Sequence, residues 1–389
     1  MRQAVVLGNP DTKRTHYLGR AAREAGLHVL FLNWDRWREN FPQGKVFLKV
    51  DPPVWGDYSL ELLGKLVENY REQLEELGRL ARLRDVEFFN EPEAITALLD
   101  KKGCKARLVT AGLAVSEEIR PDGRGGSGGD DSEKERSVKA GDEAPGAGQQ
   151  PEAEFKSEAG RQPGAGLIGN GEELLEIMRT RRVYQVFIKP LCGSGAAGVA
   201  AFRWHPGTGR MVLYTCAGVC AEREGKAPGS GLVNTKRLQK IVDSGQALSM
   251  ADRLLRLGCI VERWYAKAEY QGFSYDLRAV MQDGRMDFCL ARLSRGPITN
   301  LHLNNHPLKL GMLGLSGQVS DEIGELCRNA MRCFPGLRSA GIDILLERGS
   351  LRPRIIEMNA QGDLIYQDIY AQNLIYRHQA EMMKMSCSR

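Results

Sequence analysis

The sequence predicts an α/β domain at the N-terminus followed by α+β structure over the rest of the chain. A strand, a helix and a second strand follow one another within residues 4–32, an order typical of a parallel α/β sheet. Antiparallel hairpins are expected at residues 276–293 and 341–359. The 389 residues are too many for one hydrophobic core of ordinary size, so we expect two or three domains.

The composition is that of a soluble globular protein, with 42% hydrophobic and 26% charged residues. The net charge of +5 is spread over 54 basic and 49 acidic residues, so we expect no nucleic-acid partner, although an anionic substrate would be favoured. The nine cysteines are dispersed and form no CxxC pair, as in a reducing compartment. No signal peptide and no long apolar run are present, so we expect a cytoplasmic protein without a membrane partner.

The first elements are expected in the order strand, helix, strand, at residues 4–8, 13–25 and 27–32. Gly26 is placed to end the helix. The loop before this helix could bind a ligand at the helix N-terminus or be an ordinary turn. Over residues 57–83, leucines recur at three- and four-residue steps, which predicts a long helix with a buried face.

A further helix is expected to begin near Asn90 and Pro92 and to end at Asp100 and Lys101. The character of the chain then changes over residues 121–166, which are rich in Gly, Ser, Glu, Lys and Pro and almost free of aliphatic residues. Such a segment buries too little apolar surface to offset the entropy of ordering. We therefore predict a disordered insertion here.

After the insertion, helices and strands are expected in alternation with turns. Helices are predicted over residues 174–178, 236–257, 318–333 and 366–384, and strands over residues 184–190, 198–204, 211–220 and 259–265, besides the two hairpins.

The second hairpin carries the first chemical signal. If its turn lies near residue 350, Asp343 lies opposite Glu357 and Ile344 lies opposite Ile356. Ile342, Ile344, Ile356 and Met358 would then pack on one face, and Asp343, Glu357 and Asn359 would meet on the other. Three oxygen ligands suit Mg²⁺, which also takes phosphate oxygens, so a nucleotide is expected nearby. The alternative is a pair of surface carboxylates on an amphipathic hairpin.

A second signal follows the strand at residues 184–190. Lys189 ends this strand, and the small residues of Gly193–Gly198 follow it. Backbone N–H groups of such a loop can hold phosphates, and the lysine can add a positive charge. The alternative is a flexible turn beside an exposed lysine.

Together these motifs resemble the ATP-grasp superfamily. The resemblance implies that Asp100–Lys101 supplies one phosphate-binding lysine, for which Lys102 and Lys105 compete, and that Lys189 supplies the second. It also implies a glycine-rich lid loop, a hinge strand at the adenine, an acid at the ribose and a magnesium triad. The lid loop would include Gly193, Ser194, Gly195 and Gly198, and the hinge strand Glu262, Arg263 and Trp264. The acid at the ribose would be Glu269, and the magnesium triad Asp343, Glu357 and Asn359.

Asp276-Leu-Arg278 resembles the Asp-x-Arg of the family's core hairpin, and Arg292 and Asn300-Leu-His302 resemble segments of the ribosomal-protein glutamate ligase branch. The domains implied are an N-terminal pre-ATP-grasp α/β domain, a first part with the insertion, a lid and a catalytic core: residues 1–90, 91–182, 183–260 and 261–389.

The implied activity is an ATP- and Mg²⁺-dependent carboxylate–amine ligase that acts through an acyl phosphate on an amino acid or a peptide. Arg292 would hold the acyl phosphate, and Asn300 would orient metal-bound or substrate oxygens. Arg278 could touch substrate or pair with Asp276. His302 could accept a proton or be structural. Two alternatives remain, a kinase that phosphorylates a hydroxyl and a non-catalytic nucleotide-binding protein.

Overall fold

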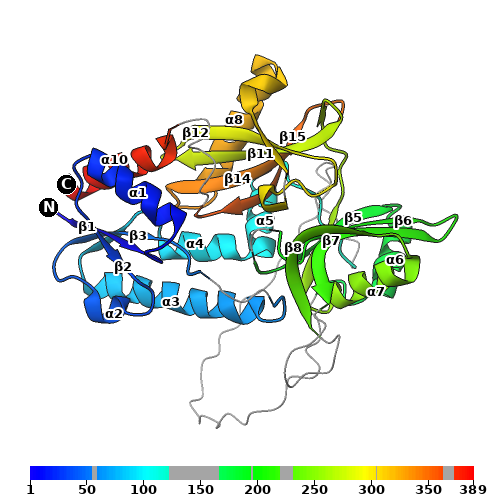
Figure 1. The fold of residues 1–389 in the computed structure, drawn as a ribbon, viewed down its shortest axis with the longest axis horizontal. Helices are drawn as coiled ribbons and strands as arrows, with labels where there is room; N and C mark the ends of the chain where they lie inside the picture. Colours follow the sequence, from blue (N-terminus) through cyan, green and yellow to red (C-terminus); the bar gives the residue numbers. More distant parts are fainter. Residues whose placement is uncertain (55–58, 122–165, 194–195, 220–230, 304, 362–371) are drawn as a thin grey trace, which may run out of the picture.

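The computed structural model describes residues 1–389 except 55–58, 122–165, 194–195, 220–230, 304 and 362–371 (Figure 1). Almost all of the predicted insertion at 121–166 therefore lies outside the described residues, as do Ser194 and Gly195. Within the described residues the strands form three sheets.

The N-terminal sheet is parallel throughout, in the order β2-β1-β3-β4. Its strands are β1 (Gln3–Leu7), β2 (Val29–Leu32), β3 (Val46–Val50) and β4 (Val86–Phe88). Helices α1 (Lys13–Glu24) and α10 (Leu374–Ser388) lie on one side, and α2 (Trp37–Asn40) and α3 (Leu63–Leu83) lie on the other (Figure 1). Alternate residues of β1 are buried on the two sides, Ala4 and Val6 beneath α1 and α10, and Val5 and Leu7 with the core around α3. The α/β prediction for this region is confirmed.

Helix α3 begins at Leu63, later than the predicted start at residue 57. The buried face of α3 includes Tyr70, whose ring packs edge-on against Trp34. Trp34 and Trp37 are buried in this core, so they are packing residues. The next helices are α4 (Pro92–Leu99) and α5 (Lys101–Thr110), and the carboxylate of Asp100 caps α5 by accepting from two backbone N–H groups.

The core sheet is antiparallel and contains both predicted hairpins, in the order β13-β12-β11-β14-β15 with β10 beside β11. Its strands are β10 (Glu269–Tyr270), β11 (Phe273–Gln282), β12 (Arg285–Ser294), β13 (His306–Lys309), β14 (Ser339–Leu346) and β15 (Pro353–Asn359). Helix α8 (Gly317–Arg332) and the 3-10 helices η1 (Leu301–Leu303) and η2 (Leu310–Leu313) connect these strands.

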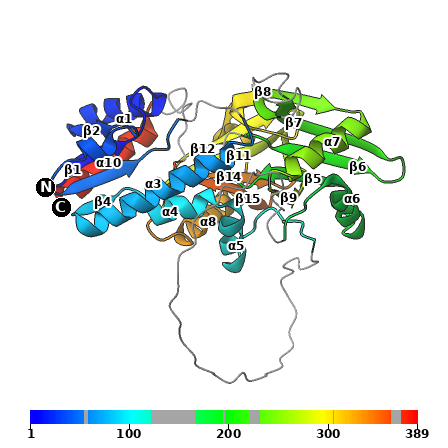
Figure 2. The same ribbon diagram turned by 90° about the horizontal axis from the view of Figure 1, so that it is seen from below.

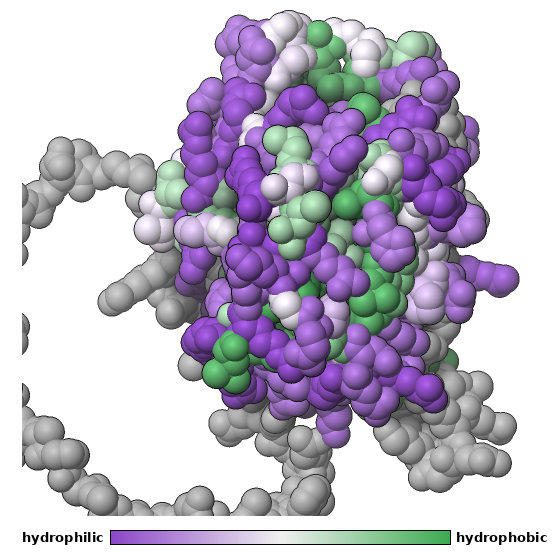
Figure 3. All heavy atoms as spheres, turned by 90° about the vertical axis from the view of Figure 1, so that its left-hand side faces the viewer, coloured by the Kyte–Doolittle hydropathy of each residue, from purple (hydrophilic) through white to green (hydrophobic). Residues whose placement is uncertain are grey.

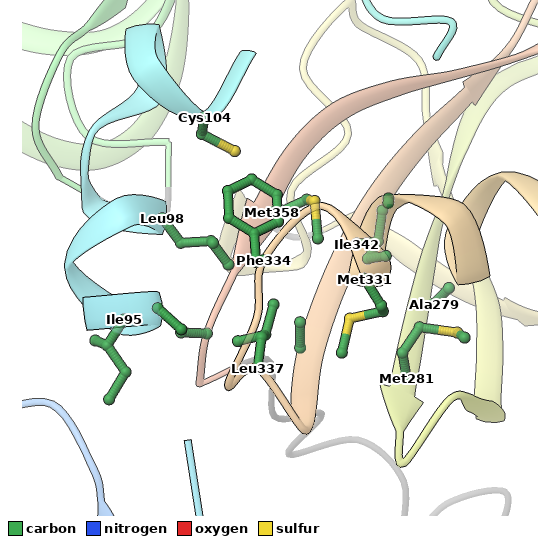
Figure 4. Packing of buried hydrophobic residues seen from close by; sticks show 14 of the residues in the cluster. Ile95, Leu98, Cys104, Ala279, Met281, Met331, Phe334, Leu337, Ile342 and Met358 are labelled. Carbon is green, nitrogen blue, oxygen red and sulfur yellow. The ribbon is translucent and has the colours of Figure 1, made fainter. Parts of the chain in front are cut away.

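The hairpin of β14 and β15 determines which side chains face the core. Asp343 lies opposite Glu357, as predicted, but a β-bulge follows, and Ile344 lies opposite Ile355 instead of Ile356. Met358 points into the core that lies between α4 and the core sheet (Figure 4). Ile355 is buried in the same core, whereas Ile356 lines a cavity beside Glu357. The bulge therefore adds an apolar residue to the polar face of the hairpin.

The third sheet, here called the lid sheet, has the order β8-β7-β6-β5-β9. Its strands are β5 (Gln185–Pro190), β6 (Ala200–His205), β7 (Arg210–Val219), β8 (Leu232–Ile241) and β9 (Cys259–Arg263). Helices α6 (Gly171–Thr180) and α7 (Ser244–Leu255) lie against one face (Figure 2). The helix predicted over residues 236–257 is wrong in its first part, because residues 232–241 pair with β7 and complete the sheet.

Hydrophilic residues cover most of the end of the molecule that carries β1, α1 and α10 (Figure 3). No helix in the described parts of the chain is long and apolar enough to cross a membrane. The eight described cysteines are free.

Candidate active site

A cavity, here called the main cavity, lies between the lid sheet and the core sheet. Strands β5 and β9 of the lid sheet contribute one wall, and β11, β12, β14 and β15 of the core sheet contribute the other. The loop of residues 297–300, which follows β12, closes one side. The site thus depends on segments that are distant in the sequence.

Glu262 of β9 is the centre of a buried charge cluster. It is 1% exposed, and each of its two carboxylate oxygens binds a lysine ammonium: Oε1 accepts from Lys105, and Oε2 accepts from Lys189 at 2.5 Å. Ser116 also donates its hydroxyl to Oε2 at 2.8 Å. Burial opposes the charge of Glu262, but the two ammonium groups outweigh it and lower its pKa to about 2.

Lys105 and Lys101 lie one turn apart on α5, and the structure gives them different partners. Besides Glu262, Lys105 donates to the carbonyl oxygen of Ser116 at 2.8 Å. The ammonium of Lys101 lies 3.7 Å from a carboxylate oxygen of Glu357. Both lysines line a cavity that Lys189 shares. Lys105, one of the two residues that compete with Lys101 in the sequence, is therefore the lysine that shares Glu262 with Lys189.

The carboxylates of Asp343 and Glu357 lie on adjacent strands and both line the main cavity. Arg278 donates to Asp343 Oδ1 at 2.6 Å, and Arg292 Nη2 lies 3.1 Å from Oδ2. Arg278 thus pairs with Asp343 and not with Asp276, the partner considered from the sequence, because it is Asp343 that lies opposite Arg278 across β11 and β14. Asn359 lies at the end of β15, opposite Gly341.

Asp276 forms a second buried network on the core side. It accepts from Arg292 Nε at 2.7 Å, and Lys267 donates to Asp276 at 3.3 Å and to Thr299 Oγ1 at 2.7 Å. Burial opposes the charge of Asp276, yet Arg292 and Lys267 lower its pKa to about 2. Lys267 also donates to the carbonyl oxygen of Pro297 at 3.2 Å, so this network holds the 297–300 loop against the cavity.

Of the comparisons with known proteins, the one with solved structures identifies the architecture. No protein-family model matches the chain, and no curated protein sequence matches it. Among solved structures, the ATP-grasp ligase PsnB, bound to a minimal precursor, Mg and ADP, is similar at a TM-score of 0.53 and 13% identity, over 100% of this chain and 99% of that chain. The macrocyclase MdnC from Microcystis aeruginosa MRC, bound to the precursor peptide MdnA, is similar at 0.53 and 12% identity, over 98% and 99%.

A third similar structure is the D-alanine–D-alanine ligase from Bacillus anthracis complexed with ATP, at a TM-score of 0.50 and 12% identity, over 100% of this chain and 96% of that chain. The chain has the ATP-grasp fold. The likeness does not single out the ribosomal-protein glutamate ligase branch, which stays a prediction.

The remaining residues named from the sequence occupy different places in this ATP-grasp fold. Arg263 and Asn300 line the main cavity. Trp264 packs against Phe187, a cavity residue, with ring centroids 5.4 Å apart. Glu269 is exposed and pairs with Arg348, and it is not among the residues that line the cavity.

The glycine-rich loop and His302 are described only in part. Gly193 and Gly198 have φ values of 102° and 68°, which a residue with a Cβ rarely adopts, and Gly198 also packs against Pro190 and Leu60. Ser194, Gly195 and the side chain of His302 lie outside the described residues.

Sequence reasoning missed Lys267 and Thr299 as site residues. Neither lies in a motif of its own. Their role depends on the approach of β11 to the 297–300 loop, which only the folded chain shows.

The side chains on β14 and β15 offer oxygen atoms, the ligand type that a hard cation such as Mg²⁺ prefers, and both oxygens of Asp343 also pair with Arg278 and Arg292. Two carboxylates from adjacent strands line one cavity, and the Asn359 amide lies two residues after Glu357. Within the described part of the chain, no group of three or more His, Cys, Asp or Glu residues could hold a metal ion. A metal bound here would thus need further oxygens from Asn359, from water or from a phosphate, as Mg²⁺ commonly does.

Proposed function

We propose that this protein is an ATP- and Mg²⁺-dependent carboxylate–amine ligase that acts on an amino acid or a peptide. One observation carries the proposal: Lys189 and Glu262 line the same cavity between the lid and core sheets as Asp343 and Glu357, and Lys105 binds the same Glu262. A lysine ammonium in the same cavity as two carboxylates provides the charges that a metal–triphosphate complex requires. The similar structures support the proposal, because they are ligases and a macrocyclase in complexes with ATP, with ADP and Mg, or with precursor peptides.

In this proposal ATP lies between the two sheets. Lys189 binds phosphate oxygens, and Glu262 holds its ammonium group and that of Lys105 in place. Phe187 of the lid sheet and Ile356 of the core sheet provide apolar walls for the base. Glu262 then acts mainly by positioning the lysines, because both of its oxygens are already bound.

The magnesium ligands would be Asp343, Glu357 and Asn359, and the ion would neutralise charge on the phosphates. A substrate carboxylate oxygen attacks the γ-phosphorus, the bond to the β-phosphate oxygen breaks, and ADP leaves. Arg292 lies beside Asp343 and binds the oxygens of the resulting acyl phosphate. A substrate amine then attacks the acyl carbon, phosphate leaves, and the amine proton passes to solvent.

The experiment is an ADP-release screen with amino acids, peptides and alcohols, followed by hydroxylamine trapping. A ligase forms a hydroxamate from its carboxylate substrate. ADP release stimulated by an alcohol, with no hydroxamate, would instead indicate a kinase. ADP that never exceeds one equivalent per protein would indicate a non-catalytic nucleotide-binding protein.

A further inference from the structure

The carboxylate of Asp343 already has two cations of the chain as partners. Asp343 lies opposite Arg278 in the register of β11 and β14, and Arg278 donates to Oδ1 at 2.6 Å. Arg292 Nη2 lies 3.1 Å from Oδ2. Hydrogen bonds between ionised groups are stronger than those between neutral groups. A metal ion that binds Asp343 therefore competes with two guanidinium groups for its negative charge.

The two arginines are not held equally firmly. Arg292 also donates its Nε to Asp276 at 2.7 Å, and its side chain is 8% exposed. Within the described residues Arg278 has one carboxylate partner, Asp343, and its side chain is 17% exposed. Loss of the contact with Asp343 would leave Arg292 fixed by Asp276. Arg278 is therefore the guanidinium group that Asp343 can exchange for another cation.

Arg278 and Glu357 lie on opposite sides of Asp343. Strand β14 lies between β11 and β15 in the core sheet, and Asp343 faces Arg278 on β11 and Glu357 on β15. The ammonium of Lys101 lies 3.7 Å from a carboxylate oxygen of Glu357, beyond hydrogen-bond distance. An ion shared by the two carboxylates would therefore draw Asp343 away from Arg278.

The charges around this pair of carboxylates do not favour a free divalent cation. Three carboxylates of the core sheet face four cations of the chain. The carboxylates are those of Asp276, Asp343 and Glu357, and the cations are Lys101, Lys267, Arg278 and Arg292. A divalent ion would add positive charge to a set that is already balanced, which is unfavourable away from bulk water. The phosphates of a nucleotide would supply the negative charge that such an ion requires.

Resting on the proposed function, we propose that Arg278 is a positioning residue that keeps Asp343 from binding a metal ion until a nucleotide is present. In the nucleotide-free protein, Arg278 binds Oδ1 of Asp343 and compensates its charge. Nucleotide phosphates in the main cavity offset the charge of the incoming ion, and Asp343 then exchanges Arg278 for the metal. The protein thus takes up Mg²⁺ together with the nucleotide and not as a free ion.

The test measures metal binding without turnover, on the full chain. Mn²⁺ is the probe, because it takes the same oxygen ligands as Mg²⁺ and its unbound fraction is measured by EPR. Without nucleotide, we expect Arg278→Met to bind Mn²⁺ at least about tenfold more tightly than the wild type, since one competing positive charge is lost. Arg278→Lys keeps this charge and should bind Mn²⁺ as weakly as the wild type does. Arg278→Gln is the second variant if Arg278→Met does not fold.

Arg354→Met is the matched control. The Arg354 side chain is also 17% exposed, and it pairs with Glu347 in the turn of the same hairpin. Its Mn²⁺ affinity should equal that of the wild type. Equal Mn²⁺ affinity of Arg278→Met and the wild type would overturn the proposal, and so would an equal gain in Arg354→Met. Failure of the wild type to bind Mn²⁺ and ADP together would instead contradict the proposed function.

Discussion

Glu262 and Asp51 are both almost completely buried carboxylates beside lysines, yet only one of them is fully paired. Glu262 receives Lys105, Lys189 and a hydroxyl, and every one of these donors comes from the chain. Asp51 receives Lys49 on one oxygen and has no described partner on the other. The first cluster is a prearranged pair of cations, and the second is an acceptor that still requires a donor.

The difference determines whether each carboxylate can still accept a hydrogen bond from another group. A satisfied network holds its lysines at fixed positions before the nucleotide arrives, which is the condition for electrostatic catalysis. An unsatisfied oxygen costs stability until a ligand binds, and proteins retain such groups at functional sites.

The largest effect is expected from Lys189→Met, which removes one ammonium from Glu262. Because this charge faces the proposed phosphate site, ATP turnover should fall by about 100-fold or more. The measurement is the steady-state rate of ADP release. Lys240→Met is the matched control, because Lys240 is exposed on β8 of the same sheet and should have nearly unchanged turnover. Normal turnover in Lys189→Met would remove the phosphate role from the Glu262 cluster.

Glu357→Gln tests whether the carboxylates opposite the cluster act on the same nucleotide. We expect ADP release to fall by about 100-fold and the Mg²⁺ concentration for half-maximal rate to rise, since one anionic ligand is lost. Glu347→Gln is the control, because the Glu347 side chain is 24% exposed against 26% for Glu357 and pairs with Arg354 near the turn of the same hairpin. Equal Mg²⁺ dependence in both variants would contradict the metal assignment.

The pKa of Glu262 provides a prediction that needs no substrate. Its folded-state pKa of about 2 lies below the ordinary 4.5, so its ionisation stabilises the fold fully above about pH 4.5. That contribution is lost as the pH falls through 4.5 towards 2. Carbon NMR of the labelled Glu262 carboxylate should show no titration above about pH 3. A midpoint near 4.5 would mean that the lysines do not hold this carboxylate in solution.

Asp51→Asn is expected to have the smallest of these effects. The amide oxygen can still accept from Lys49, but the charge is lost, so the free energy of unfolding should fall by about 1–3 kcal/mol. Denaturant unfolding measures it. The control is Asp283→Asn, which removes an exposed carboxylate paired with Arg338 and should cost under about 1 kcal/mol. Equal losses would show that the Lys49–Asp51 pair is no more important than a surface pair.

Local patterns were enough for much of the fold. The strand–helix–strand order of the N-terminus, both hairpins and the pairing of Asp343 with Glu357 follow from turn signals and alternation, and the structure confirms them. The helix expected at 236–257 failed in its first part because pairing with β7 overrode the local pattern. The bulge beside Asp343 was missed because a two-residue period assumes a regular ladder.

What the sequence by itself determined is the set of chemical groups and their local spacing: two lysines near glycine and helix signals, and carboxylates on a hairpin. Only the tertiary structure decided which groups meet. In the folded chain Lys105 contacts Glu262, which lies 157 residues later in the sequence. Lys101 lies beside Glu357 instead, and Arg278 pairs with Asp343. The physical reason is that buried charges are stable only with a partner, and the partner depends on how sheets and helices pack, which no local pattern encodes.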